Sequence, residues 1–250
     1  MKYLNTLWLL SLPILFACSP QPDAQSIIDK SIAAHGGGQL DHASLSFDFR
    51  KRHYELTIDN GNFRYQSFFE DSTGQVQDEL TNKGYRRQLN GQWLSLSAED
   101  SIKYMNSLNS VVYFALLPYF LNDPAANKKL LGKTRIQGEP YYELEVTFDQ
   151  QGGGTDYEDE FVYWIHQQAH TMDYLAYSFY VNGGGTRFRE AYNERDLNGI
   201  RLADYVNYES TVEDFALEDY ETLFEEGKVK ELSRIDLENV KVSKEISDEV

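Results

Sequence analysis

The sequence predicts an α+β protein in which a strongly curved antiparallel sheet, an incomplete β-barrel, wraps around one or two helices. Eighteen Tyr and 14 Phe against 3 Met favour pleated, half-buried strands over a helical bundle. Alternating apolar and polar residues over 156–208, broken by short turns, predict consecutive antiparallel strands. Residues 111–121 are apolar nearly all round, which predicts a buried helix inside the curve of that sheet.

Length and charge limit the classes of protein that fit. A chain of 250 residues can bury one substantial core, so we expect a single domain over residues 26–250. The formal net charge is −17, which argues against a nucleic-acid partner, because phosphate binding needs clustered Lys and Arg. Residues 209–250 hold 14 acidic and 5 basic residues, an acidic tail typical of a solvated surface.

The amino terminus indicates export. Lys2 precedes an apolar run that is too short to span a bilayer but suits a secretory signal, which we place at residues 1–17. Leu15 to Cys18 resembles a bacterial lipobox, and Cys18 is the only cysteine, so we expect it to be lipidated and to anchor the protein to the membrane. A plain secretory signal is the alternative. Residues 18–25 form a short tether, and Ser19 after the cysteine resembles the pattern of outer-membrane lipoproteins.

A helix is expected next. Asp23 or Ser26 can cap its start, and isoleucines at 27, 28 and 32 form one apolar face through Ala34. His35 and the glycines that follow it suit the end of this helix, where a cation interacts favourably with the helix dipole.

Residues 45–96 follow the alternation of an antiparallel meander. Strands are expected within 45–58, 62–69, 84–89 and 92–97, and Asn90-Gly91 between the last two favours a type I′ turn. Two basic clusters, Arg50–Arg52 and Arg86–Arg87, are expected to face neighbouring acids on the outer surface rather than to form an anion site.

Ser97, followed by Glu99 and Asp100, predicts the start of the apolar helix, which Pro118 ends. This helix is either ordinary core or the wall of a site for an apolar ligand. The residues that we expect to bind such a ligand are Val112, Phe114, Leu116, Leu117, Tyr119, Phe120, Arg187 and Arg189.

A hairpin over 132–148 leads into the meander of residues 156–208. Expected strands are 141–148, 157–165, 171–181, 187–194 and 200–209, with a short helix over 217–226 and a last strand over 229–235. The glycine-rich loops near 152 and 183 then lie at one edge of the sheet, where the strands turn, and we call this edge the glycine rim. The turns near 168 and 198 lie at the opposite edge, which we call the histidine rim. Acids at 156–160 and the arginines 187 and 189 lie at the glycine rim, where cross-strand ion pairing on the outer face is the simplest arrangement.

Two patterns suggest catalysis or metal binding. Glu158 and Glu160, if on one face of a strand, would lie at about the separation that glycoside hydrolysis requires. His166 and His170, with Asp173, flank a turn and could converge on a metal. Solvated acids and exposed turn histidines explain both patterns more simply, and the sequence contains no Gly-x-Ser-x-Gly or His-Glu-x-x-His motif.

These segments resemble a family of bacterial lipoproteins of unknown function. The motifs that carry the resemblance are AAHGG at 33–37, LLPYFL at 116–121, YEDEFVYWI at 157–165, DYLAYSF at 173–179, RFREAYN at 187–193 and GIRLADYVNY at 199–208. The chain is more distantly similar to the lipoprotein-carrier and lipid-binding lipoprotein superfamily, whose open β-barrels shelter acyl chains. The resemblance implies no established activity.

Together, these observations predict a lipid-anchored envelope protein that binds a lipid or another apolar ligand without catalysis, facing the periplasm or the cell surface. We expect no cofactor, and we take a monomer as the default oligomeric state. The alternatives are an envelope hydrolase acting on glycan or lipid, and a structural or assembly partner that uses its acidic surface.

Overall fold

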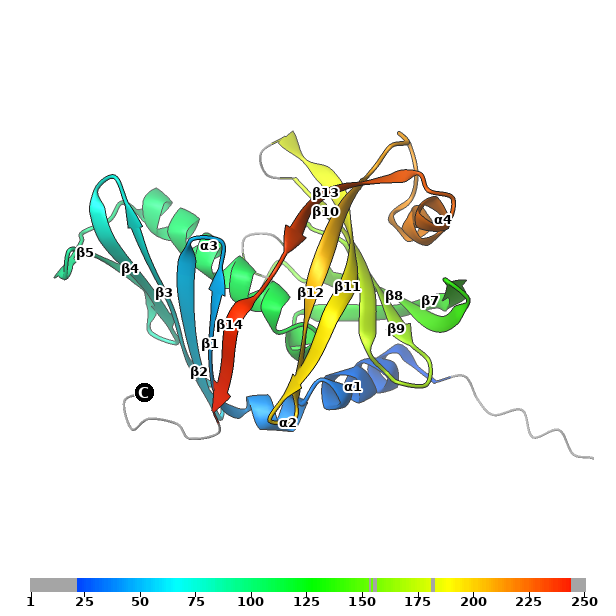
Figure 1. Cartoon of the computed structure of the whole chain (residues 1–250), viewed down its shortest axis with the longest axis horizontal. Coiled ribbons are helices and arrows are strands. Elements are labelled where there is room, and N and C mark those ends of the chain that lie inside the picture. Colours follow the sequence, from blue (N-terminus) through cyan, green and yellow to red (C-terminus); the bar gives the residue numbers. More distant parts are fainter. Residues whose placement is uncertain (1–21, 153, 155–156, 181–182, 244–250) are drawn as a thin grey trace, which may run out of the picture.

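Two seven-stranded antiparallel sheets form the body of the protein. The computed structural model describes residues 22–152, 154, 157–180 and 183–243. The first sheet has the order β14-β1-β2-β3-β4-β5-β6, and the second sheet has the order β13-β12-β11-β10-β9-β8-β7 (Figure 1). Cys18, the signal segment 1–17, most of the tether and Asp156 lie outside the described residues.

The first sheet comprises β1 (His42–Phe49), β2 (Arg52–Asp59), β3 (Asn62–Asp71), β4 (Gly74–Thr81), β5 (Gly84–Leu89), β6 (Gln92–Trp93) and β14 (Glu238–Ser243). The second sheet comprises β7 (Ala126–Ile136), β8 (Glu139–Phe148), β9 (Phe161–His166), β10 (Met172–Phe179), β11 (Gly185–Leu197), β12 (Ile200–Ser210) and β13 (Val229–Ile235). The helices are α1 (Ala24–Ala34), α2 (Gly37–Leu40), α3 (Ala98–Ala115) and α4 (Tyr220–Glu225), with 3-10 turns η1 (Tyr119–Asn122) and η3 (Leu217–Asp219).

The two sheets are joined at their edges. The chain leaves β13 at the edge of the second sheet and, after Asp236 and Leu237, enters β14 at the edge of the first (Figure 1). The Leu237 amide donates to Asp204 on β12, and Arg195 donates to the Leu237 carbonyl, so both backbone polar groups of this crossing point are satisfied. The result is an open, curved antiparallel wall, which confirms the predicted fold class, although the curve consists of two sheets rather than one.

Helix α3 lies between the sheets (Figure 1). The Ser97 side chain accepts from the Asp100 amide at 3.0 Å, as the capping pattern predicts. Leu108, Val112 and Leu116 pack with the inward-facing residues of the first sheet. The apolar helix is therefore inside the curve, as expected, and it ends at Ala115, just before the cis Leu117–Pro118 peptide bond.

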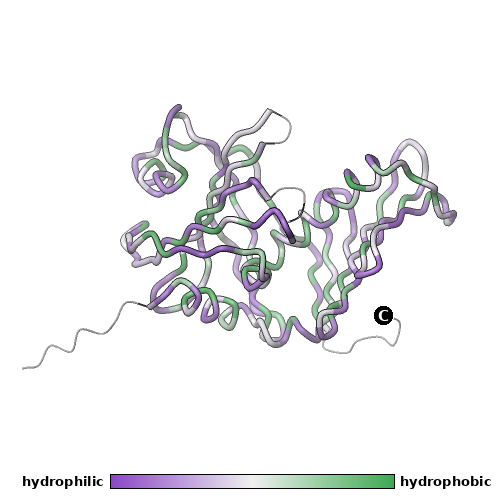
Figure 2. Tube along the Cα trace, turned by 180° about the vertical axis from the view of Figure 1, so that it is seen from behind, coloured by the Kyte–Doolittle hydropathy of each residue, from purple (hydrophilic) through white to green (hydrophobic). Residues whose placement is uncertain are grey.

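Helix α1 covers part of the concave face of the second sheet. Asp23 caps it, and Ile27 and Ile28 pack among Leu144 and other residues of that face. Gly36 follows with φ +86°, and a Cβ there would lie 2.3 Å from the Gly199 carbonyl oxygen, so only glycine permits this close approach. In Figure 2 hydrophobic and hydrophilic stretches alternate along α1 and along the strands, as expected for elements with one buried face.

A third layer covers the opposite face of the second sheet. There, Tyr220 of α4 and Phe224 pack on Trp164 and Phe188. Since Phe161 and Tyr163 belong to the concave face, β9 is buried on both sides. None of the helices in the described part of the chain is long and apolar enough to cross a membrane.

Several predicted boundaries were wrong. Strands β4 and β14 were not expected, and β9 begins at Phe161, so residues 157–160 precede the strand. The hairpin strand β7 begins at Ala126 rather than at 132. By contrast, Asn90 and Gly91 both have positive φ values of 50° and 79°, which fits the predicted tight turn.

The position of Arg87 also differs from the prediction. Arg86 faces outward and pairs with Glu79, as expected for an outer-face charge. Arg87 points the other way and pairs with Asp78 beneath α3, where both side chains are buried. The charge pattern did not reveal this inward pair because it depends on the facing strand and on the helix above it.

Candidate ligand-binding site

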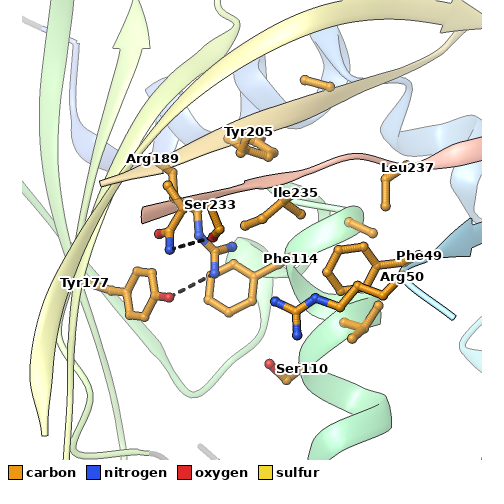
Figure 3. Close-up of a pocket in the computed structure, with 14 residues that line it drawn as sticks. Phe49, Arg50, Ser110, Phe114, Tyr177, Arg189, Tyr205, Ser233, Ile235 and Leu237 are labelled. Atoms are coloured by element: carbon orange, nitrogen blue, oxygen red, sulfur yellow. Dashed lines mark hydrogen bonds between the residues drawn. The ribbon is translucent and has the colours of Figure 1, made fainter. Parts of the chain in front are cut away.

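Two adjoining cavities lie between α3 and the concave face of the second sheet. The larger cavity has a volume of about 730 Å³, and its lining includes Leu80, Met105, Phe148 and Phe179. The smaller cavity has a volume of about 250 Å³ and is lined partly by Ile235 and Leu237. Both are lined by Ser110, Phe114, Tyr177 and Arg189, so these four residues form the boundary between them (Figure 3).

The face of α3 that borders the larger cavity is the more polar one. Its residues recur at helical spacing and are Met105, Asn106, Asn109, Ser110, Tyr113 and Phe114. The more apolar face, with Leu108 and Val112, packs on the first sheet instead. Hydrophobicity alone therefore did not identify the side of this helix that faces the cavities.

Aromatic rings from three strands and α3 form much of the apolar lining. Phe114 lies 5.3 Å from Tyr177 between ring centroids, and Tyr177 stacks on Phe161 at 5.9 Å. Tyr113 and Tyr163 share a hydrogen bond between their hydroxyl groups at 3.4 Å, and burial raises the pKa of both hydroxyls. Both tyrosines are therefore neutral, and Tyr113, which lines the larger cavity, presents an uncharged surface to it.

Arginine side chains interrupt this apolar lining. Arg187 and Arg189 line the larger cavity, and Arg50 and Arg189 line the smaller one. The Arg189 guanidinium lies 4.0 Å from the centre of the Phe114 ring and donates to the Tyr177 hydroxyl at 2.9 Å. None of the ion pairs between described residues involves Arg187 or Arg189, so neither arginine pairs with Glu158 or Glu160 in the way that cross-strand pairing predicted.

The predicted ligand-binding residues fall into two groups. Phe114, Arg187 and Arg189 line the cavities. The others pack in or against the cores and line neither cavity, and these are Val112, Leu116, Leu117, Tyr119 and Phe120. The sequence did not identify Met105, Ser110, Tyr177 or Phe179 as residues that line a cavity. The glycine rim predicted from the sequence does border the larger cavity, through Gly154 and Asp159.

Glu158 and Glu160 are both exposed and lie in the loop before β9. The Glu158 carboxylate accepts from the adjacent Tyr157 hydroxyl at 3.2 Å, and the backbone of Glu160 pairs with Ser178. Neither residue lines either cavity. The spacing argument for a carboxylate pair assumed a strand that does not extend to these residues.

The histidine rim contains separate contacts rather than a cluster. His166 Nε2 lies 3.4 Å from Glu139, and its Nδ1 accepts from the Ala169 amide at 3.0 Å. Asp173 accepts from Arg201 at 3.2 Å and from the Tyr141 hydroxyl at 3.1 Å. No group of three His, Cys, Asp or Glu within the described residues is arranged to hold a metal ion.

His35, at the end of α1, is a buried neutral histidine rather than the expected cation. Its Nδ1–H donates to the Ser31 carbonyl at 2.8 Å, and its Nε2 accepts from Arg201 at 2.8 Å. Burial, together with the nearby Arg201 charge, lowers its pKa from 6.5 to about 4 despite the Ser31 hydrogen bond and Asp173. Protonation would put a second cation against Arg201.

We therefore expect acid to destabilise the protein through His35. Because the folded-state pKa lies below the unfolded-state value, this stabilisation is complete above pH 6.5 and is lost as the pH falls toward about 4. The loss should approach about 3 kcal/mol for this buried group. Urea unfolding across this range should give a shallower pH dependence for His35→Gln than for the wild type or for His42→Gln, at an exposed histidine. Identical slopes for all three proteins would contradict the assignment.

The fold and the cavities define the class: an open, curved antiparallel wall with two largely apolar cavities beside α3. A family model described as a family of unknown function (DUF6503) matches residues 5–237, and the chain belongs to that family. This confirms the resemblance to a family of unknown function. No curated protein matches the chain.

Comparison with solved structures gives the following similar chains. A DUF1329 family protein from Desulfovibrio piger is 13% identical over 90% of this chain and 95% of its own, with a TM-score of 0.55. A LolA superfamily protein from Nitrosomonas europaea is 15% identical over 88% and 93%, with a TM-score of 0.48. The lipoprotein LppX from Mycobacterium tuberculosis is 12% identical over 64% and 90%, with a TM-score of 0.29. At 13% identity, the likeness to the Desulfovibrio piger protein concerns the fold alone.

Proposed function

We propose that this protein is a lipid-anchored protein of the cell envelope that binds a lipid or another apolar ligand between α3 and the second sheet, without catalysing a reaction. The larger cavity carries the proposal. Its volume of about 730 Å³ falls within the range of about 300–1,000 Å³ that is usual for small-molecule sites. Phe114, Phe161 and Phe179 give it an apolar lining, where exclusion of water contributes about 25 cal/mol per Å² of buried apolar surface.

The anchor is the second part of the proposal. Acylation of Cys18, for which the lipobox-like Leu15 to Cys18 is the motif, would hold the protein at the outer membrane. The short segment between Cys18 and α1 would then keep the cavities near the lipid surface. Mass spectrometry of protein extracted from cells tests both parts. Native spectra should show a co-purifying lipid, and denaturing spectra should show acyl chains on a chain that begins at Cys18. A free, unmodified protein would contradict the proposal.

A bulky residue at the boundary of the two cavities should block binding. Ser110 lines both cavities and is exposed toward them, so Ser110→Trp should weaken binding of the uncharged fluorescent probe N-phenyl-1-naphthylamine about tenfold or more. Ser107→Trp is the matched control, because Ser107 is an exposed serine of the same helix that lines neither cavity. Equal probe binding by the two variants would place the apolar site elsewhere.

A further inference from the structure

Arg189 is a buried cation with no counter-charge among the residues that the structure describes. Its residue is only 8% exposed, and no carboxylate among the described residues forms an ion pair with it. Its Nε–H also has no acceptor within the described part of the chain. Burying an unpaired charge and an unsatisfied donor is costly, so an anionic partner would relieve both costs.

The surroundings of Arg189 supply further hydrogen-bond donors. Asn207 on β12 lies directly opposite Arg189 in the strand register, and Ser233 on β13 lies opposite Asn207. Together with the Tyr177 hydroxyl, these side chains form a polar row across the sheet beside the smaller cavity (Figure 3). In this row the hydroxyl groups of Tyr177 and Ser233 accept hydrogen bonds from Arg189 and Asn207, and each keeps a proton that it can donate to a carboxylate or a phosphate.

The charge balance of the smaller cavity points the same way. Its lining contains two arginines, Arg50 and Arg189, and no Asp or Glu among the described residues. The chain as a whole has a formal net charge of −17. A cavity whose charged lining residues are both arginines therefore contrasts with the rest of the protein. The larger cavity differs, because Asp159 borders it together with Arg187. Within the site, the smaller cavity is therefore the better place for an anion.

We propose that the ligand is an anionic amphiphile: its head group, a carboxylate or a phosphate monoester, binds Arg189 at the smaller cavity, and its apolar chain occupies the larger one. Arg189 is suited to this role because it lines both cavities. Phe114, which also lines both, packs against the guanidinium and provides the apolar surface where head group and chain would meet. This inference rests on the proposed function and adds the chemical class of the ligand to it.

Competition against N-phenyl-1-naphthylamine tests the head group. Above neutral pH, dodecanoate should displace half of the probe from the wild-type protein at a concentration about tenfold lower than dodecan-1-ol, which has the same chain and no charge. Arg189→Met should abolish this preference and leave displacement by the alcohol nearly unchanged. Arg234→Met is the control for the loss of an arginine: Arg234 is an exposed residue of β13 that lines neither cavity, so the preference should remain.

Further competitors distinguish an anionic lipid from a small free anion. Dodecyl phosphate should displace the probe as dodecanoate does, whereas inorganic phosphate and acetate, which lack the chain, should not. Arg189→Lys keeps the charge but loses the two-pronged geometry, so it should retain part of the preference.

Two outcomes would overturn the inference. Equal displacement by dodecanoate and dodecan-1-ol in the wild type would contradict the proposal that the ligand has an anionic head group. This comparison does not depend on any variant folding. A preference that survives in Arg189→Met would place the head group elsewhere. Failure of the wild type to bind the uncharged probe at all would instead contradict the proposed function.

Discussion

Replacing Arg87 by methionine is expected to lower the free energy of unfolding by about 3–5 kcal/mol. Arg87 donates from Nε and Nη2 to the two carboxylate oxygens of Asp78 at 2.6 and 2.8 Å. Only 11% of the Arg87 side chain and 2% of the Asp78 side chain are exposed, because Tyr104 of α3 lies over the guanidinium at 3.4 Å. The methionine would leave a buried carboxylate without its cation. Urea unfolding measures the loss.

The double variant Asp78→Leu with Arg87→Met separates two costs: that of leaving a buried carboxylate unpaired, and that of losing the attraction between the two charges. Replacing both charges by apolar side chains should recover most of the stability, because the stranded carboxylate is gone. Lys129→Met is the control for an exposed pair: Lys129 contacts Glu145 at 3.1 Å with 67% of its side chain exposed, and its loss should cost under about 1 kcal/mol. A double variant as unstable as Arg87→Met alone would show that packing beneath α3, rather than the ion pair, is what matters.

The elements with local signals were predictable from the sequence. The starts of α1 and α3 follow from capping residues at Asp23 and Ser97, and the turn at Asn90-Gly91 follows from its dipeptide. Strand β4 was not predicted because Asp78 and Glu79 interrupt its apolar alternation. These acids are tolerated there because arginines of β5 pair with them and neighbouring side chains donate further hydrogen bonds to them. The formation of β4 therefore depends on its partner strand more than on the pattern of its own residues.

Strand β14 and the cavities depend on still longer-range contacts. Residues 238–243 alternate only weakly, and they become a strand by pairing with β1, almost two hundred positions earlier in the chain. The identity of the cavity-facing side of α3 likewise depends on where the second sheet lies. Arg189 was placed among possible ligand-binding residues from its position at the glycine rim. Its burial without an ion pair to any described residue could not be deduced, since the acids at 158–160 looked equally able to reach it.

Phe188→Ala is expected to cost about 3–5 kcal/mol of unfolding free energy, the usual range for removing a fully buried phenylalanine ring. Phe188 is completely buried, and its ring lies 5.6 Å from Trp164, 5.5 Å from Tyr220 and 5.2 Å from Phe224, between ring centroids. The cavity left behind would loosen α4 on the convex face of the second sheet. Phe188→Leu, which keeps more of the side-chain volume, should cost less, and chemical denaturation with tryptophan fluorescence would measure both variants.

The same variant separates stability from binding. Phe188 and Arg189 are neighbours on β11, and because side chains of a strand alternate faces, one holds the outer core while the other lines the cavities. Phe188→Ala should therefore bind N-phenyl-1-naphthylamine with nearly wild-type affinity per folded molecule, at a temperature where it remains folded. Arg189→Met should show the reverse, with altered ligand preference and less change in stability. Loss of probe binding in folded Phe188→Ala would mean that the two faces of the second sheet are coupled, and that the outer core shapes the cavities through the strands.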